Sequence, residues 1–107
     1  MKNSLDNYNL IEVVLATHNV ALNEDIVGVL ATTTTPVTIN LPAINTLPNG
    51  KKRLTIKDES GNSVVNNITI LPNGGDLING SVNYLINNNY GSVNLYSNPN
   101  IDQWFSY

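Results

Sequence analysis

The chain has 107 residues, of which 12% are charged, and it carries a formal net charge of −3 and no cysteine. A chain of this length builds one hydrophobic core, and without cysteine its stability does not depend on disulfides. The few basic residues, gathered in 51–53 and at Lys57, do not make a nucleic-acid footprint in an acidic protein, and no stretch approaches the roughly 18 apolar residues of a membrane span.

Residues 1–9 are polar and show no hydrophobic periodicity, which predicts an N-terminal arm that a partner would order. In an assembly protein such an arm is often the attachment segment. Residues 10–17 are mostly apolar, and Val13 and Val14 favour a strand over a short helix there. Residues 19–25 follow as a turn.

An apolar run at 26–31 and an alternating run at 37–41 predict two more strands. Within the second run, Val37, Ile39 and Leu41 point to one face. The four threonines between the runs suit a hairpin with exposed β-branched positions.

Pro42 and Pro48 bracket a loop in which residues 43–47 can make one helical turn. The pair Asn49-Gly50 ends this loop as a typical turn. No other part of the chain is predicted to be helical. Asparagine, at about a fifth of the chain, supplies most of the polarity and is poor in helix interiors.

The second half of the chain alternates short apolar runs with Gly/Asn turns. Six apolar residues sit two apart within their runs, so each pair points to one face of a strand: Leu54 and Ile56, Ile68 and Ile70, Val93 and Leu95. Turn signals recur about every eight to twelve residues, the spacing typical of β-sandwiches and jelly rolls. We therefore expect an all-β fold in which residues 10–107 form a single small antiparallel β-sandwich, jelly-roll-like, after the short N-terminal arm. No internal repeat at a fixed period indicates a solenoid.

Metal ligands are scarce. His18 is the only histidine, so a metal site would need three copies of it on a threefold axis, and the alternative is a plain loop histidine. The densest acidic loop, with Asp58, Glu59 and Asn62, contains hard oxygen ligands of the kind that Ca²⁺ prefers. Its order does not match an EF-hand loop, so we expect Asp58 and Asn62 to bond backbone N–H groups of the loop instead.

Catalytic signatures are absent from the sequence. No Gly-x-Ser-x-Gly elbow marks a serine nucleophile, and Gly74-Gly75 lacks the lysine of a phosphate-binding loop. A glycan hydrolase would need two converging carboxylates, for which only Asp58, Glu59, Asp76 and Asp102 are available. We therefore expect a non-enzymatic protein with no cofactor and no metal.

Aromatic residues gather in the last quarter of the chain, at Tyr84, Tyr90, Tyr96, Trp104, Phe105 and Tyr107. Exposed together among Asn and Asp side chains, such rings would make a sugar-binding surface, with rings for stacking and amides for hydroxyls. Alternatively, Trp104 closes the core or an intersubunit contact, with Tyr96 beside it. The candidate glycan or interface residues are Tyr84, Tyr90, Tyr96 and Trp104, and a core or interface role is favoured.

The second half also carries an ordered set of motifs: TIKDESGN at 55–62, NNITI at 66–70, Gly74-Gly75, ING at 78–80, NYGSVNLYS at 89–97 and Trp104. This order resembles a β-module of phage virion proteins, found in head-fibre and capsid decoration proteins and at tail-fibre ends. The resemblance extends over residues 22–107 when DIVGVLATTTTPVTINLP is counted as the opening hairpin of the module.

The resemblance implies a structural protein of the virion that assembles as a homotrimer and either decorates the capsid or forms a head fibre. Its partners would be copies of itself and the major capsid protein or another virion protein, without nucleic acid and without membrane insertion. The alternative is a carbohydrate-binding receptor-recognition module at a tail-fibre tip, which would meet a host-surface glycan with Tyr84, Tyr90 and Trp104. Exposure of those rings on one open surface would separate the two hypotheses.

Overall fold

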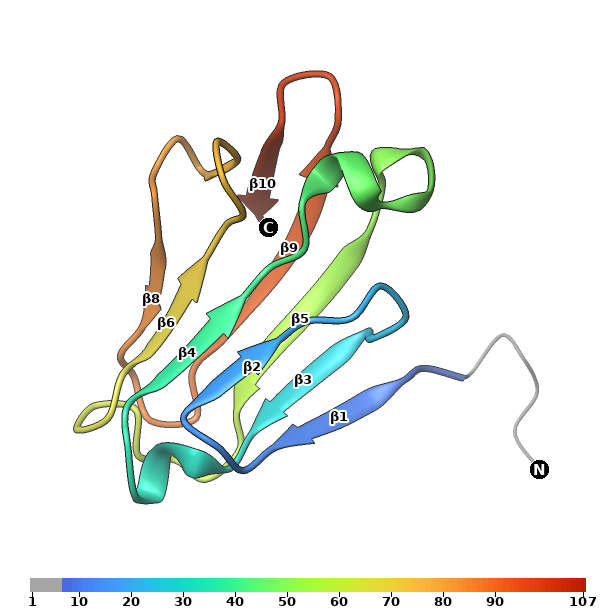
Figure 1. Cartoon of the computed structure of the whole chain (residues 1–107). Coiled ribbons are helices and arrows are strands. Elements are labelled where there is room, and N and C mark those ends of the chain that lie inside the picture. Colours follow the sequence, from blue (N-terminus) through green and yellow to red (C-terminus); the bar gives the residue numbers. More distant parts are fainter. Residues whose placement is uncertain (1–6) are drawn as a thin grey trace.

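The computed structural model describes residues 7–107, which form ten strands and three short 3-10 helices (Figure 1). The strands are β1 (Leu10–Val13), β2 (Thr17–Asn19), β3 (Ile26–Val29), β4 (Val37–Asn40), β5 (Arg53–Asp58), β6 (Ile68–Leu71), β7 (Leu77–Ile78), β8 (Tyr84–Ile86), β9 (Ser92–Asn98) and β10 (Gln103–Ser106). The 3-10 helices are η1 (Ala31–Thr33), η2 (Ile44–Thr46) and η3 (Pro48–Gly50). The helical turn predicted at 43–47 is therefore present as η2.

The strands make two sheets that enclose one hydrophobic core (Figure 1). The larger sheet has the order β1-β3-β5-β9-β10-β7, and the smaller has the order β2-β4-β6-β8. The all-β, sandwich-like fold predicted from the alternating runs is confirmed.

Strand direction differs from the antiparallel sandwich that the sequence predicts, because both sheets are mixed. Strands β1, β3 and β5 pair in parallel, and so do β2, β4 and β6. The pairs β5–β9, β9–β10 and β6–β8 are antiparallel. The connections explain this arrangement: from β1 to β6 each strand lies in the opposite sheet from the one before, so the chain re-enters each sheet in the same direction.

This coiled path also replaces the hairpin predicted between residues 26–31 and 37–41. Strands β3 and β4 lie in different sheets, and η1 forms part of the crossing between them. Leu10 pairs with Ile26 and Ile26 pairs with Thr55, so one return to the sheet takes 16 residues and the next takes 29. Returns of such unequal length leave no fixed period in the sequence.

The core follows the predicted alternation. On β5 the buried apolar residues are Leu54 and Ile56, and on β9 they are Val93 and Leu95. Trp104 on β10 is the largest of the fully buried side chains, with an exposed fraction of 0%. The residues next to these in sequence therefore point out of the sandwich and form its outer faces.

Two turns depend on a left-handed backbone at Asn-Gly pairs. The φ angles are 55° at Asn49 and 69° at Gly50, and 50° at Asn79 and 77° at Gly80. Asparagine and glycine adopt this region at the lowest cost, which is why both pairs are recognisable as turns in the sequence. The first turn leads directly into β5.

Asn9 fixes the start of the described chain to the segment before β3. Its backbone N–H donates to the carboxylate of Asp25 at 2.7 Å, and its carbonyl accepts the N–H groups of Asp25 and Ile26 at 2.9 and 3.0 Å. The predicted arm of residues 1–9 thus ends in this contact, and its residues 1–6 lie outside the described part. Across residues 7–107, no helix is long and apolar enough to cross a membrane.

Candidate functional site

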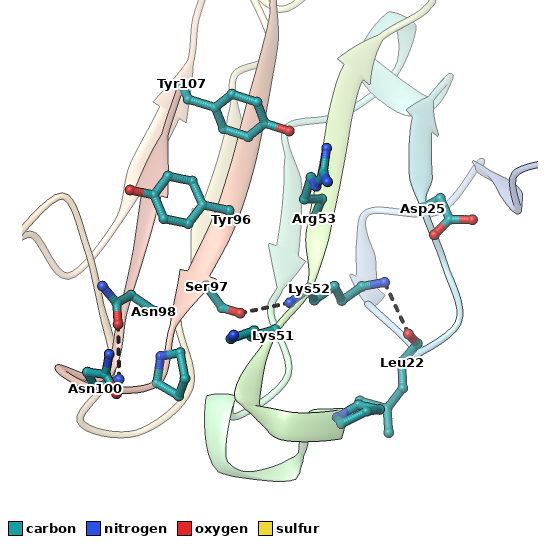
Figure 2. A pocket seen from close by; sticks show the side chains of 12 residues that line it. Leu22, Asp25, Lys51, Lys52, Arg53, Tyr96, Ser97, Asn98, Asn100 and Tyr107 are labelled. Atoms are coloured by element: carbon teal, nitrogen blue, oxygen red, sulfur yellow. Dashed lines mark hydrogen bonds between the residues drawn. The ribbon is translucent and has the colours of Figure 1, made fainter.

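An open groove lies on the outer side of the six-stranded sheet, where β5 and β9 meet (Figure 2). Its volume of about 950 Å³ lies within the range of ligand-binding clefts. Its lining residues are Leu22, Asp25, Pro48, Lys51, Lys52, Arg53, Tyr96, Ser97, Asn98, Pro99, Asn100 and Tyr107. We call it the β5–β9 groove.

Two tyrosine rings stand on one side of this groove. Tyr96 points outward because its neighbours Leu95 and Ser97 on β9 are buried. Its ring centroid lies 5.7 Å from that of Tyr107, edge-on at 62°, and also 5.7 Å from that of Phe105. Tyr96 is 40% exposed and Tyr107 is 63% exposed, so both rings offer surface to a ligand.

Three consecutive cations, Lys51, Lys52 and Arg53, line the groove beside the rings. Arg53 is the direct cross-strand partner of Tyr96. The ring of Tyr96 points away from Arg53, whereas the hydroxyl of Tyr107 points toward it (Figure 2). Within residues 7–107, neither an ion pair nor a hydrogen bond holds the side chains of Lys51 and Arg53. The acidic lining residue is Asp25, whose carboxylate already accepts a backbone N–H. The groove is therefore basic although the chain is acidic.

Lys52 differs from its two neighbours because its side chain is partly buried. Its Nζ donates to the carbonyl of Leu22 at 3.0 Å, and its backbone N–H donates to Oγ of Ser97 at 2.9 Å. Burial lowers the pKa of Lys52, and the nearby carboxylates of Asp25 and Glu24 partly offset this effect. Lys52 therefore helps to hold the wall of the groove in place.

The end of the groove is shaped by the segment that joins β9 to β10. Oγ of the buried Ser97 donates to the carbonyl of Gly50 at 2.7 Å, which ties β9 to the turn before β5. Oδ1 of Asn98 accepts the backbone N–H of Asn100 at 3.0 Å. Within the described chain, the side-chain N–H groups of Asn98 and Asn100 have no hydrogen-bond partner. They remain as donors at the groove (Figure 2).

The four aromatic residues singled out in the sequence lie in separate places. Trp104 is buried in the core, and its indole N–H has no hydrogen-bond partner among residues 7–107. Tyr84 is partly buried against the core. Tyr90 is 59% exposed, and its ring covers Gly61, where a Cβ would lie 2.2 Å from Cζ of the ring. Tyr96 is the member of this set that lines the groove.

Asp58, at the end of β5, holds its loop together as the loop-capping hypothesis predicts. It is completely buried, and its carboxylate accepts four hydrogen bonds: from the hydroxyl of Thr32 at 2.7 Å and from the backbone N–H groups of Gly61 at 3.1 Å, Ser63 at 3.0 Å and Tyr90 at 3.1 Å. Burial acts to raise the pKa of Asp58, but these hydrogen bonds outweigh it and hold the pKa below its usual value. Asn62 departs from the hypothesis, because its amide donates to the carbonyl of Thr32.

The other carboxylates considered for metal binding or hydrolysis have separate positions. Glu59 lies over the outer face of the six-stranded sheet beside Glu12. Asp76 accepts the backbone N–H of Ile44 at 2.9 Å, and Asp102 is exposed in the turn before β10. In the part of the chain that the structure describes, no three His, Asp or Glu side chains are grouped to hold a metal ion.

His18 lies on β2, at the edge of the four-stranded sheet. Its Nε2 is 2.8 Å from Oε1 of Glu24, and the same oxygen accepts the backbone N–H of Ala21 at 3.1 Å. These contacts close the turn that follows β2. They give His18 a local structural role that needs no metal.

The basic segment 51–53 was not a candidate site at the level of the sequence. It meets Tyr96 and Tyr107 only because β5 pairs with β9, although β6, β7 and β8 lie between them in the chain. One local signal could have indicated it. Arg53 begins an alternating strand, and a cation at an outward position of a strand in an acidic protein marks an exposed basic site.

Comparison with known protein families gives a match to a family model described as "Bacteriophage T4 gp9/10-like protein, N-terminal". The match extends over residues 5–103, which is nearly the whole chain. It confirms the resemblance to phage virion modules that the motif order shows. A comparison with curated proteins gave no match.

Proposed function

The chain belongs to the family of bacteriophage T4 gp9/10-like proteins, a family of phage structural proteins, and on this premise we propose that it is a building block of the virion. In this proposal it assembles as a homotrimer and serves as a capsid decoration or head-fibre protein. Its role is non-enzymatic. Its partners are copies of itself and the major capsid protein or another virion protein.

The observation that carries this proposal is the apolar edge of the six-stranded sheet. Within the described chain, β1 has a strand neighbour on one side, β3, and none on the other. Four large apolar side chains in and around β1 are exposed: Tyr8 (52%), Leu10 (46%), Val14 (65%) and Leu15 (69%). We call residues 8–15 the β1 edge. An open strand edge that carries exposed apolar side chains invites association, and a defined assembly covers it.

The position of the β1 edge also supports a role in attachment. Residues 7–9, the described part of the predicted arm, lead directly into β1. A closed ring of subunits covers every copy of the edge, whereas an open arrangement would grow into fibres. The number three comes from the likeness to virion modules, and the β1 edge supplies the contact surface.

The mass of the purified protein in solution tests the proposal, measured by light scattering after size exclusion. We expect particles of three chains, near three times 11.6 kDa. A monomer over the whole accessible concentration range would contradict the homotrimer.

A matched pair of variants tests the role of the β1 edge. Val14→Lys places a charge on the edge and should dissociate the trimer into folded monomers. Val82→Lys is the control, because Val82 is 72% exposed but follows β7, the strand at the opposite edge of the sheet. If Val82→Lys dissociates the trimer and Val14→Lys does not, the contact has been assigned to the wrong edge.

A second candidate function is carbohydrate recognition at a tail-fibre tip. The ring set predicted for it, Tyr84, Tyr90 and Trp104, does not lie on one open surface, since Trp104 is in the core. The β5–β9 groove favours this function with different rings, those of Tyr96 and Tyr107. The receptor-recognition hypothesis therefore depends on this groove.

A further inference from the structure

The β5–β9 groove combines exposed cations with exposed tyrosine rings. Lys51 and Arg53 are exposed and have no ion-pair or hydrogen-bond partner within residues 7–107. Lys57, by contrast, is engaged, because its Nζ donates to the carbonyl of Tyr90. In a chain with a net charge of −3, these two cations make a local positive site that would attract an anionic group.

We propose that the β5–β9 groove binds an acidic saccharide, whose carboxylate pairs with Arg53 while a sugar ring stacks on Tyr96 or Tyr107. A guanidinium presents a planar fork of donors that matches a carboxylate with two parallel hydrogen bonds. Arg53 and Tyr96 occupy paired positions on β5 and β9, and the hydroxyl of Tyr107 points toward Arg53 (Figure 2). A sugar on the Tyr107 ring would therefore have its carboxylate beside the guanidinium. The inference deepens the carbohydrate-recognition function above and rests on it, and it is independent of the homotrimer.

The position of the groove in the sheet favours a saccharide over an acidic peptide. Strand β5 lies between β3 and β9, and β9 lies between β5 and β10, so the ladders of both strands are occupied on both sides. An extended peptide cannot add to the sheet here, since that mode of recognition needs an open edge. A ligand in the groove must be held by side chains that project from the sheet, which is how rings, amides and a guanidinium hold a sugar.

The end of the groove supplies the remaining donors. The side-chain amides of Asn98 and Asn100 have free N–H groups there and can meet sugar hydroxyls. Lys51, between η3 and β5, adds a second positive charge without a fixed geometry. A nucleic acid fits less well, because its affinity depends on many phosphate contacts and the groove offers few cations.

The test is a titration of the ¹⁵N-labelled protein, followed by NMR, with α2,8-linked oligosialic acid, oligogalacturonate and neutral maltohexaose. We expect the two acidic oligosaccharides to shift groove resonances, including the side-chain amides of Asn98 and Asn100, and maltohexaose to bind much more weakly. Arg53→Gln should weaken acidic binding by about tenfold to hundredfold, the range for a hydrogen-bonded charged group. Tyr96→Ala should weaken it by about tenfold through loss of stacking.

The controls separate the site from net charge and from ring number. Lys57→Gln removes one charge from the same strand, Tyr90→Ala removes one exposed ring, and neither should change the affinity by more than about twofold. If maltohexaose binds as tightly as the acidic oligosaccharides, and Arg53→Gln does not weaken its binding, the ligand is not specifically an acidic saccharide. Carbohydrate recognition by the groove would then still stand. No binding of any of the three saccharides would overturn both, and tighter binding of a single-stranded oligodeoxynucleotide would overturn the saccharide assignment.

Discussion

Gly28 of β3 lies directly beneath the carboxylate of Glu59. A Cβ at residue 28 would lie 2.3 Å from Oε1 of Glu59, so glycine leaves the room that this side chain occupies on the outer face of the sheet. Glu12 of β1 is the cross-strand partner of Gly28, and its carboxyl group can hydrogen-bond that of Glu59 when one of the two is protonated. Two carboxyl groups therefore meet on the sheet, next to the β1 edge.

This pair predicts a pH-dependent stability. The hydrogen bond with Glu12, together with burial and the repulsion between the two carboxylates, raises the pKa of Glu59, and Lys57 partly offsets the effect. The stability that this provides is complete below the ordinary glutamate pKa of about 4.3 and is lost as the pH rises through the raised pKa. Glu59→Gln should therefore be more stable than the wild type at pH 7, by up to about 1 kcal/mol because both carboxyl groups reach solvent, and the gain should vanish in acid.

Urea unfolding at pH 4 and pH 7 measures this difference. Glu12→Gln should show the same gain at pH 7, since removing either charge relieves the repulsion. Glu24→Gln should instead lower the free energy of unfolding, because Glu24 accepts hydrogen bonds from His18 and Ala21. A gain for Glu59→Gln that is equal at both pH values would refute the pair as its origin.

Asp58 gives a second prediction, with the opposite sign of pH dependence. An asparagine there could serve only part of the four donors around the carboxylate, so Asp58→Asn should lower the free energy of unfolding by about 2–4 kcal/mol. Because the pKa of Asp58 is depressed, its contribution is present above the ordinary Asp pKa of about 3.9 and is lost as the pH falls through the depressed value.

The matched control for Asp58 is Asp102→Asn. Asp102 is exposed and has a φ of 52°, a conformation that asparagine also adopts readily. Its substitution should change the free energy of unfolding by less than about 0.5 kcal/mol. Thermal unfolding followed by circular dichroism at neutral pH compares the two, and similar losses for both would count against the network around Asp58.

Local features of this fold could be predicted from the sequence because each depends on neighbouring residues. The alternation of Leu54 and Ile56 identifies a strand that is buried on one face, and the pair Asn79-Gly80 identifies a turn with positive φ. The loop around Asp58 follows from the ability of aspartate to bond backbone N–H groups a few residues away.

Strand direction and the β5–β9 groove could not be predicted, because both depend on which distant strands pair. The apolar run of β3 and the alternation of β4 are the same whether the two strands form a hairpin or cross between two sheets. Arg53 and Tyr96 are separated by three other strands in the chain, and nothing local to either residue specifies their pairing. The candidate site is therefore a property of the topology.

Trp104 provides a third prediction, since its indole N–H is buried without a partner among the described residues. Trp104→Phe loses core volume but also removes a donor whose burial costs about 1–3 kcal/mol, so the net loss should be below about 2 kcal/mol. Trp104→Ala should cost about 3–5 kcal/mol, because it leaves a large cavity. Urea unfolding followed by circular dichroism measures both, and equal losses would show that the indole N–H is satisfied.

Gly61 and Gly80 form a matched pair that tests the contact with the ring of Tyr90. Their φ angles are +76° and +77°, so an alanine at either pays the same backbone strain, about 1 kcal/mol. A Cβ at Gly80 meets open space, whereas at Gly61 it would lie 2.2 Å from Cζ of Tyr90. Gly61→Ala should therefore cost at least about 1 kcal/mol more than Gly80→Ala in urea unfolding. Combining Gly61→Ala with Tyr90→Ala should remove the excess, and an excess that persists without the ring would mean that the strain lies in the loop around Asp58.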